Sequence, residues 1–238
     1  MFWLMIATLA AFFVKGLCGF ANTLVFSTIL SFGIDNINIT PVELILGYPS
    51  NVIIAWKERK SVDWKVCLPL ALLVLLGNIP GIILLKQGDA RMIKLIFGFV
   101  IIGVGVEMFL RERSKKAVKS TKPLLALIGI ISGVLCGLYG IGALLAAYVS
   151  RVTGNSKEFK ANICIVFIVE NTFRIIMYAC TGILNLQVIG QAAVLVPFML
   201  LGLFAGMKSG KVLDERIVKK LVLVMLMLSG VALVVNHW

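Results

Sequence analysis

The chain has 238 residues, of which 60% are hydrophobic and 14% are charged, and its formal net charge is +12. Soluble domains carry about a quarter charged residues, so this composition predicts a polytopic membrane protein and leaves no room for a soluble domain of useful size. In a soluble protein a charge of +12 would suggest nucleic acid. Here the basic residues gather in short loops, as in cytoplasmic loops that face anionic lipid, so we expect the lipid bilayer and no nucleic acid as partner.

The order of apolar and polar segments divides the chain into two halves. Most of the apolar runs suit one membrane span of about 20 residues, and they cover 2–33, 40–56, 64–85, 92–110, 123–150, 161–181, 187–207 and 217–235. The strongly polar segment RERSKKAVKSTK lies near the middle of the chain. We therefore expect a first transmembrane repeat at residues 1–110, a basic cytoplasmic linker at 111–122 and a second transmembrane repeat at 123–238.

The two longest runs, the first and the fifth, contain glycines in their middle. The segment SGVLCGLYGIG at 132–142 has four glycines between apolar flanks, and KGLCGFAN at 15–22 is a milder copy. Non-helical backbone at membrane depth survives only where protein or a water-filled cavity surrounds it. Each run is therefore predicted to be a broken or re-entrant helix, and such breaks often form the solute site of a transporter.

Several features of the first half recur in the second half in the same order. They are 120 to 125 residues apart and comprise Gly16-x-x-Gly19-Phe20 with Gly137-x-x-Gly140-Ile141, Asn51 with Asn171, Gly77-x-x-x-Gly81 with Gly202-x-x-x-Gly206, and Asp89-x-Arg91 with Asp214-x-Arg216. Glycines alone would be weak evidence, because membrane helices are rich in them. Four kinds of feature at a nearly constant offset indicate a duplication.

The distribution of loop charges favours inverted repeats. If all eight runs span once, ten Lys and Arg residues lie on one side and eleven on the other, against the positive-inside rule. If the fifth run enters and leaves on one face, the counts become eighteen and three. We therefore predict an all-α protein of two inverted repeats, each with one broken helix and three transmembrane helices. Eight plain helices in a parallel repeat remain the alternative.

Two half-helix N-termini would then meet near the bilayer centre, at 19–22 and at 140–142. Free N–H groups and the positive end of the helix dipole suit a small anion. The candidate substrate-binding residues are Gly16, Gly19, Phe20, Asn22, Asn51, Gly137, Tyr139, Gly140, Gly142, Asn171 and Arg174. Glycine can instead serve close helix packing, which is the better interpretation of Gly77, Gly81, Gly202 and Gly206, and asparagine can instead join helices by hydrogen bonds.

Charged residues inside apolar runs are few. Lys15 precedes the first glycine motif, where an anion contact is conceivable. Glu170 and Arg174 stand four residues apart and would meet on one helix face, so we predict a mutually neutralising pair, with direct anion binding by Arg174 as the alternative. We find no nucleophile with a base, no metal-ligand spacing and no phosphate loop. The sequence thus predicts a non-enzyme with no cofactor and no bound metal.

The glycine-rich pair GLCGFANTL and GIISGVLCGLYGIGALLAAYV, the central basic linker and the matched membrane asparagines resemble the TauE/SafE family of sulfite and organosulfur anion exporters. The resemblance covers essentially the whole chain. It implies a multi-pass permease of the plasma (inner) membrane that moves a small sulfur-containing or carboxylate anion, driven by an ion gradient of H⁺ or Na⁺. An anion channel and a membrane-embedded partner of an enzyme complex remain alternatives, and a homo-oligomer stays open.

Overall fold

The computed structural model describes residues 1–30, 36–87, 122–140 and 142–210, together with scattered single residues between 99 and 235. Within these ranges the chain is helical and contains no strand. The prediction of an all-α membrane protein is confirmed. The runs 92–110 and 217–235 and nearly all of the basic linker lie outside the described residues, so the eight-segment count and the domain boundaries stay predictions.

The described helices fall into a group before the linker and a group after it. The first group is α1 (Phe2–Cys18), α2 (Asn22–Leu30), α3 (Asn36–Lys57), the 3-10 helix η1 (Arg59–Ser61) and α4 (Trp64–Gln87). The second group is α6 (Lys122–Tyr139), α7 (Ala143–Val152), α8 (Ser156–Cys180) and α9 (Leu186–Ser209). Among the described residues, three segments are long and apolar enough to cross a membrane, namely Trp64–Leu84, Ser156–Cys180 and Leu186–Ser209.

Both glycine-rich runs contain a short non-helical stretch between two helices. Helix α1 gives way to Gly19, whose φ is 87°, and α2 begins after Ala21, which also has a positive φ of 72°. Helix α6 gives way to Gly140, with a φ of 69°, and Gly142 precedes α7. Left-handed backbone is nearly free of cost for glycine and strained for other residues. Glycine at these two positions therefore lets the chain leave one helix and enter the next.

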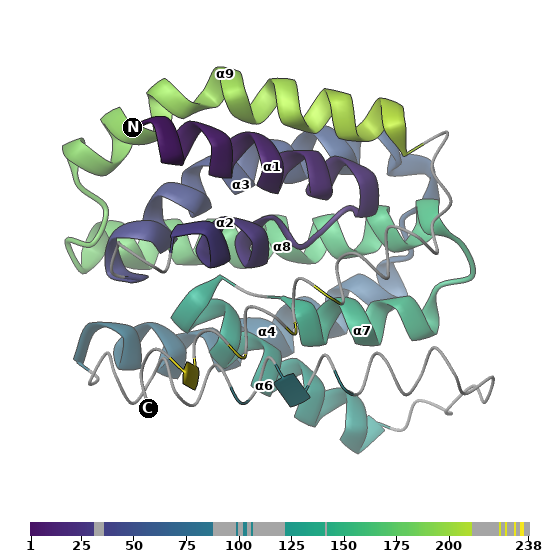
Figure 1. The fold of residues 1–238 in the computed structure, drawn as a ribbon. Helices are drawn as coiled ribbons and strands as arrows, with labels where there is room; N and C mark the ends of the chain where they lie inside the picture. Colours follow the sequence, from purple (N-terminus) through teal and green to yellow (C-terminus); the bar gives the residue numbers. More distant parts are fainter. Residues whose placement is uncertain are drawn as a thin grey trace.

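Figure 1 shows how the helices lie side by side. Helix α1 packs against α9, α4 packs against α6, and α3 packs against α8. Helix α2 runs back alongside α1, and α7 runs back from the end of α6. The α1–α2 hairpin begins and ends toward the left of the view, whereas the α6–α7 hairpin begins and ends toward the right. The middle of the bundle, where both hairpins turn, is bounded by α3 and α8.

Glycines let the backbones of the paired helices approach closely. A Cβ atom on Gly81 of α4 would lie 3.0 Å from the Cα of Gly137 on α6, and one on Gly206 of α9 would lie 3.1 Å from the Cα of Gly16 on α1. Real Cβ atoms rarely come so near to backbone. This confirms the packing role predicted for the glycines of the two G-x-x-x-G motifs, Gly77, Gly81, Gly202 and Gly206.

Candidate functional site

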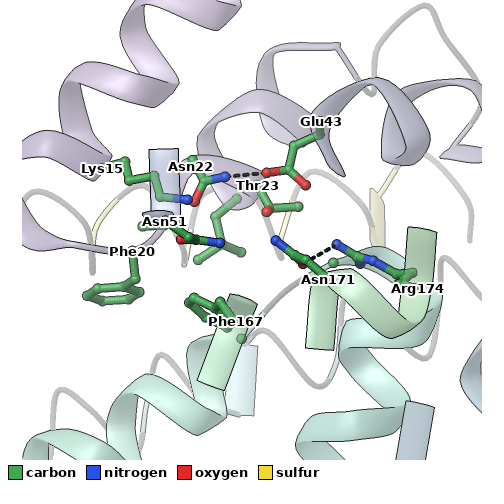
Figure 2. Close-up of a pocket in the computed structure, with 13 residues that line it drawn as sticks. Lys15, Phe20, Asn22, Thr23, Glu43, Asn51, Phe167, Asn171 and Arg174 are labelled. Atoms are coloured by element: carbon green, nitrogen blue, oxygen red, sulfur yellow. Dashed lines mark hydrogen bonds between the residues drawn. The ribbon is translucent and has the colours of Figure 1, made fainter. Parts of the chain in front are cut away.

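A small cavity lined by buried side chains lies where the two helix breaks meet (Figure 2). The centre of a water molecule could move within a volume of about 20 Å³ inside it. Its walls come from α1, the first break and α2, from α3, from the second break, and from α8. They comprise Lys15, Phe20, Ala21, Asn22, Thr23, Leu24, Glu43, Asn51, Gly140, Gly142, Phe167, Asn171 and Arg174.

Most of the candidate binding residues lie in this wall. The cavity brings together Phe20, Asn22, Asn51, Gly140, Gly142, Asn171 and Arg174. Gly16 and Gly137 instead lie at the α1–α9 and α6–α4 contacts. Gly19 lies beside the Lys160 side chain, because a Cβ there would be 2.7 Å from Lys160 Cγ. The side chain of Tyr139 is outside the described set. Whether any of these residues binds a solute stays a prediction.

Arg174 connects α8 to the second helix break. Its Nε lies 3.4 Å from Glu170 Oε1 on the same helix, so the predicted pair is present. Its Nη1 donates to the carbonyl of Cys136 at 2.5 Å, and its Nη2 donates to Asn171 Oδ1 at 3.2 Å. Cys136 is in the last turn of α6, and its carbonyl oxygen also accepts a hydrogen bond from the backbone N–H of Gly140 at 2.7 Å. The guanidinium is therefore a second donor to the last turn of α6, where the helix breaks, and it also lies in the cavity wall.

The backbone at Gly140 comes close to this guanidinium. A Cβ atom on Gly140 would lie 2.7 Å from Arg174 Nη1 and 3.2 Å from Glu43 Oε2. The absence of a side chain at position 140 is what lets these opposite charges approach the same point. Gly142 is equally restricted, because a Cβ there would run into the ring of Phe167.

Sequence patterns alone missed Glu43, a carboxylate in the cavity wall. It belongs to α3, is 2% exposed, and accepts a hydrogen bond from Asn22 Nδ2 (Figure 2). A single acid within the apolar run 40–56 was a usable signal, because ionisable residues at membrane depth are costly and mark functional sites. It was overlooked because it is not among the features that occur in both halves. At the offset that relates Asn51 to Asn171, the position matching Glu43 is Ile163.

Lys15 provides a second buried cation in the wall. Its side chain is 1% exposed, and its ammonium nitrogen lies 3.5 Å from the carbonyl oxygen of Gly47. The same nitrogen is 5.8 Å from the centre of the Phe12 ring. The long side chain therefore does not reach an interface but ends inside the protein, in the cavity wall (Figure 2).

The amide side chains and helix ends supply further polar groups. Helix α2 begins at Asn22 in the wall, and Gly142 lies in the wall just before α7. The first N–H groups of a helix have no partner within the helix. Asn51 and Asn171 come from α3 and α8, and Asn51 Oδ1 is buried without a hydrogen-bond partner. A buried polar atom without a partner indicates a place where water or a ligand atom completes the site. Among the described residues, no three His, Cys, Asp or Glu side chains cluster as metal ligands.

Comparison with known proteins assigns the chain to a family. The family model described as "Sulfite exporter TauE/SafE" matches residues 4–233. The probable sulfite/organosulfonate exporter TauE of Cupriavidus necator is 24% identical over 199 residues, which are 76% of this chain and 77% of that protein. No solved structure matches the chain significantly. The chain thus belongs to the TauE/SafE sulfite exporter family of membrane transport proteins, as its glycine-rich motifs and central basic linker predicted.

Proposed function

We propose that this protein is a secondary transporter that carries a small anion, sulfite or another sulfur-containing or carboxylate anion, across the plasma membrane. The observation that carries the proposal is the buried cavity between the two helix breaks. Lys15 and Arg174 supply positive charge, and the starts of α2 and α7 supply N–H groups. Phosphate-like anions and carboxylates favour such helix N-termini. Membership of an exporter family supports the same class of solute.

We infer further that the two halves are inverted repeats. In support, the packing partners exchange between halves: α1 packs on α9 and α6 packs on α4. This is expected if a pseudo-twofold axis exchanges α1 with α6 and α4 with α9. The two hairpins also open toward opposite ends of the bundle (Figure 1). A solute bound between the hairpin tips would then face either side after a modest movement of one repeat against the other.

The cavity is too small for the proposed solute. About 20 Å³ is open to the centre of a water-sized sphere, and about 10–15 Å³ suffices for one water. An anion with several non-hydrogen atoms needs more room, so the hairpin tips must separate to admit it. In a transporter that must open and close for each solute, the rate of transport reaches a maximum as the solute concentration rises. An open channel passes many solutes each time it opens, so its rate does not reach a maximum in this way.

Flux into liposomes tests the proposed activity. The purified protein alone, reconstituted into liposomes, should give saturable uptake of sulfite that responds to an imposed ion gradient. Flux that does not saturate would favour the channel, and the absence of flux for sulfite, sulfate, sulfonates and small carboxylates would favour the enzyme-partner alternative. A thermal-stability screen of the same preparation against these anions identifies which of them binds.

Substitution of Gly140 tests the position of the site. In Gly140→Ala the new methyl group meets Arg174 and Glu43, so we expect anion affinity to fall at least about tenfold. Alanine at a left-handed position also costs roughly 1–2 kcal/mol, and Gly182→Ala is the matched control. Gly182 has a φ of +74° and no atom within 4 Å of a built Cβ. Both variants should lose stability because of the left-handed backbone, and Gly140→Ala should lose more because its methyl group is crowded by Arg174 and Glu43. Only Gly140→Ala should lose anion binding. Normal binding by Gly140→Ala would move the site elsewhere.

A further inference from the structure

The buried charges next to the cavity sum to zero. Among the described residues, four charged side chains in or beside the cavity wall are at most 2% exposed: Lys15, Glu43, Glu170 and Arg174. Two are positive and two are negative. A monoanion that enters the cavity adds one uncompensated negative charge. Uncompensated charge at membrane depth is strongly unfavourable, so the loaded site needs one further positive charge or one fewer negative charge.

The two carboxylates are held differently. Glu170 is not in the cavity wall, pairs with Arg174 Nε at 3.4 Å and accepts a hydrogen bond from Asn78 Nδ2 at 2.9 Å. Glu43 is in the wall and accepts hydrogen bonds from Asn22 and Thr23, which are themselves wall residues. An arriving anion therefore meets Glu43 directly. Neutralising Glu170 would break its ion pair with Arg174, whereas neutralising Glu43 leaves that pair intact.

The groups that face Glu43 favour a proton over a metal cation. Its charged neighbours are Arg174 and Glu170 of α8 and Lys15 of α1. Two uncharged ionisable groups, the Cys136 thiol of α6 and the Tyr178 hydroxyl of α8, also lie within range of its charge. Lys15 and Arg174 oppose the binding of Na⁺ and of a proton alike, but the arriving anion offsets one of these positive charges. Na⁺ would in addition need several oxygen ligands, whereas a proton needs one carboxylate oxygen. A proton on the carboxylate, by contrast, gives a neutral acid that leaves Lys15 and Arg174 free to attract the anion.

We propose that Glu43 is the proton-binding site of this transporter, and that its carboxylate takes up one proton for each monoanion that enters the cavity. The inference rests on the proposed function and deepens it by naming H⁺ as the coupled ion. The proton passes from water to a Glu43 oxygen and is released again when the anion leaves. The loaded site is then neutral, because Lys15 and Arg174 balance Glu170 and the anion. Anion and proton bind cooperatively and cross the membrane together.

Proton uptake on anion binding tests this directly. Methanesulfonate is the probe, because its conjugate acid is strong and the ion carries no proton of its own. With the purified full chain in weakly buffered detergent solution, a pH indicator should report up to one proton taken up per methanesulfonate bound. Affinity should fall about tenfold per unit rise in pH wherever a full proton is linked to binding. In Glu43→Gln, binding should persist without proton uptake and without this pH dependence.

Glu58→Gln is the matched control, because Glu58 follows α3 at its other end and is outside the cavity wall. It should keep the proton uptake of the wild type. Methanesulfonate binding by the wild type without proton uptake overturns the inference, as does proton uptake that survives in Glu43→Gln. If Glu43→Gln does not fold, Glu43→Asp takes its place, because it keeps a carboxyl group but changes its position. It should keep the proton uptake with the pH dependence of binding shifted, and a pH dependence identical to that of the wild type would assign the proton to another group and overturn the inference. Absence of binding for methanesulfonate, sulfite and sulfate at every pH would instead contradict the proposed anion site itself.

Discussion

Arg174 stabilises the fold at the second helix break and also lies in the wall of the proposed anion site. Its three nitrogens contact Glu170, Asn171 and the carbonyl of Cys136, so it links α8 to the end of α6. Arginine suits this position because its planar guanidinium carries five donors and keeps its charge when buried. The contacts with Glu170 and Cys136 hold the break in shape, and the remaining donors face the cavity beside Gly140.

Neutralising the pair should reveal the structural task. Removing one partner of a buried ion pair leaves an uncompensated charge and costs about 3–5 kcal/mol. We expect Arg174→Gln and Glu170→Gln each to lower the melting temperature in detergent more than the double variant does, because the double variant leaves no unpaired charge. Purely additive losses would show that the two charges are not coupled. An Arg174→Gln variant that stays stable but loses anion binding would make Arg174 chiefly a ligand.

Among the residues of the site, sequence patterns identified those whose chemistry repeats. Asn51 and Asn171 were found because each half places an amide in an apolar run, and Arg174 because it stands four residues from an acid. Glu43 has no counterpart, so a search for repeated features passes over it. Gly16 and Gly137 could not be distinguished from Gly140, because the sequence does not say which face of a broken helix meets a neighbouring helix and which meets the cavity.

At the scale of the helices, glycine has two separate uses. At Gly19 and Gly140 it accepts a positive φ and ends a helix, while along α4, α6 and α9 it removes side chains from helix contacts. The sequence located both breaks to within a few residues, because clustered glycines weaken a helix in the middle of an apolar run. The sequence could not predict that α1 packs against α9 and α4 against α6, because these contacts depend on how the two halves assemble.

Two substitutions in α9 separate packing from helix propensity. In Gly202→Ala the methyl group would lie 2.5 Å from the Leu9 carbonyl oxygen and 3.1 Å from the Phe13 nitrogen, so α1 must move. We expect a loss of about 1–3 kcal/mol, as for other overpacked contacts, with anion binding reduced only in proportion. Gly190→Ala is the control, because nothing lies within 4 Å of its built Cβ. Alanine is favoured over glycine there by up to about 1 kcal/mol.

Thermal unfolding of both variants in detergent measures the difference. Gly190→Ala should melt at or slightly above the temperature of the wild type, and Gly202→Ala should melt below it. Equal melting temperatures would mean that α1 and α9 do not pack as closely as their glycines allow. Loss of anion binding in Gly202→Ala without loss of stability would give this glycine a role at the solute site.

At the scale of the whole molecule, the positions of the Lys and Arg residues predict which end of the bundle faces the cytoplasm. The end of α3, the start of α4, the start of α6, the end of α7 and the end of α9 lie toward one end of the bundle (Figure 1). The proposed inverted arrangement would put most loop Lys and Arg residues at that end, and under the positive-inside rule that end would face the cytoplasm. From charge alone the sequence predicts eighteen loop Lys and Arg residues on that side against three on the other, and many of them lie outside the described residues.

The orientation of the fifth run can be tested with introduced cysteines. The native thiol of Cys180 is exposed and is first replaced by serine. Single cysteines then replace Lys122 and Arg151 at the two ends of the α6–α7 hairpin, Arg59 in η1 as a reporter of the same end, and Leu186 at the start of α9 as a reporter of the opposite end. An impermeant maleimide is applied to sealed vesicles of each orientation.

We expect positions 122, 151 and 59 to react from the cytoplasmic face and position 186 only from the other, because a hairpin returns to the face it entered. Reaction of positions 122 and 151 from opposite faces would make the fifth run a single span and the repeats parallel, and the two half-helix N-termini could no longer approach the anion from opposite sides.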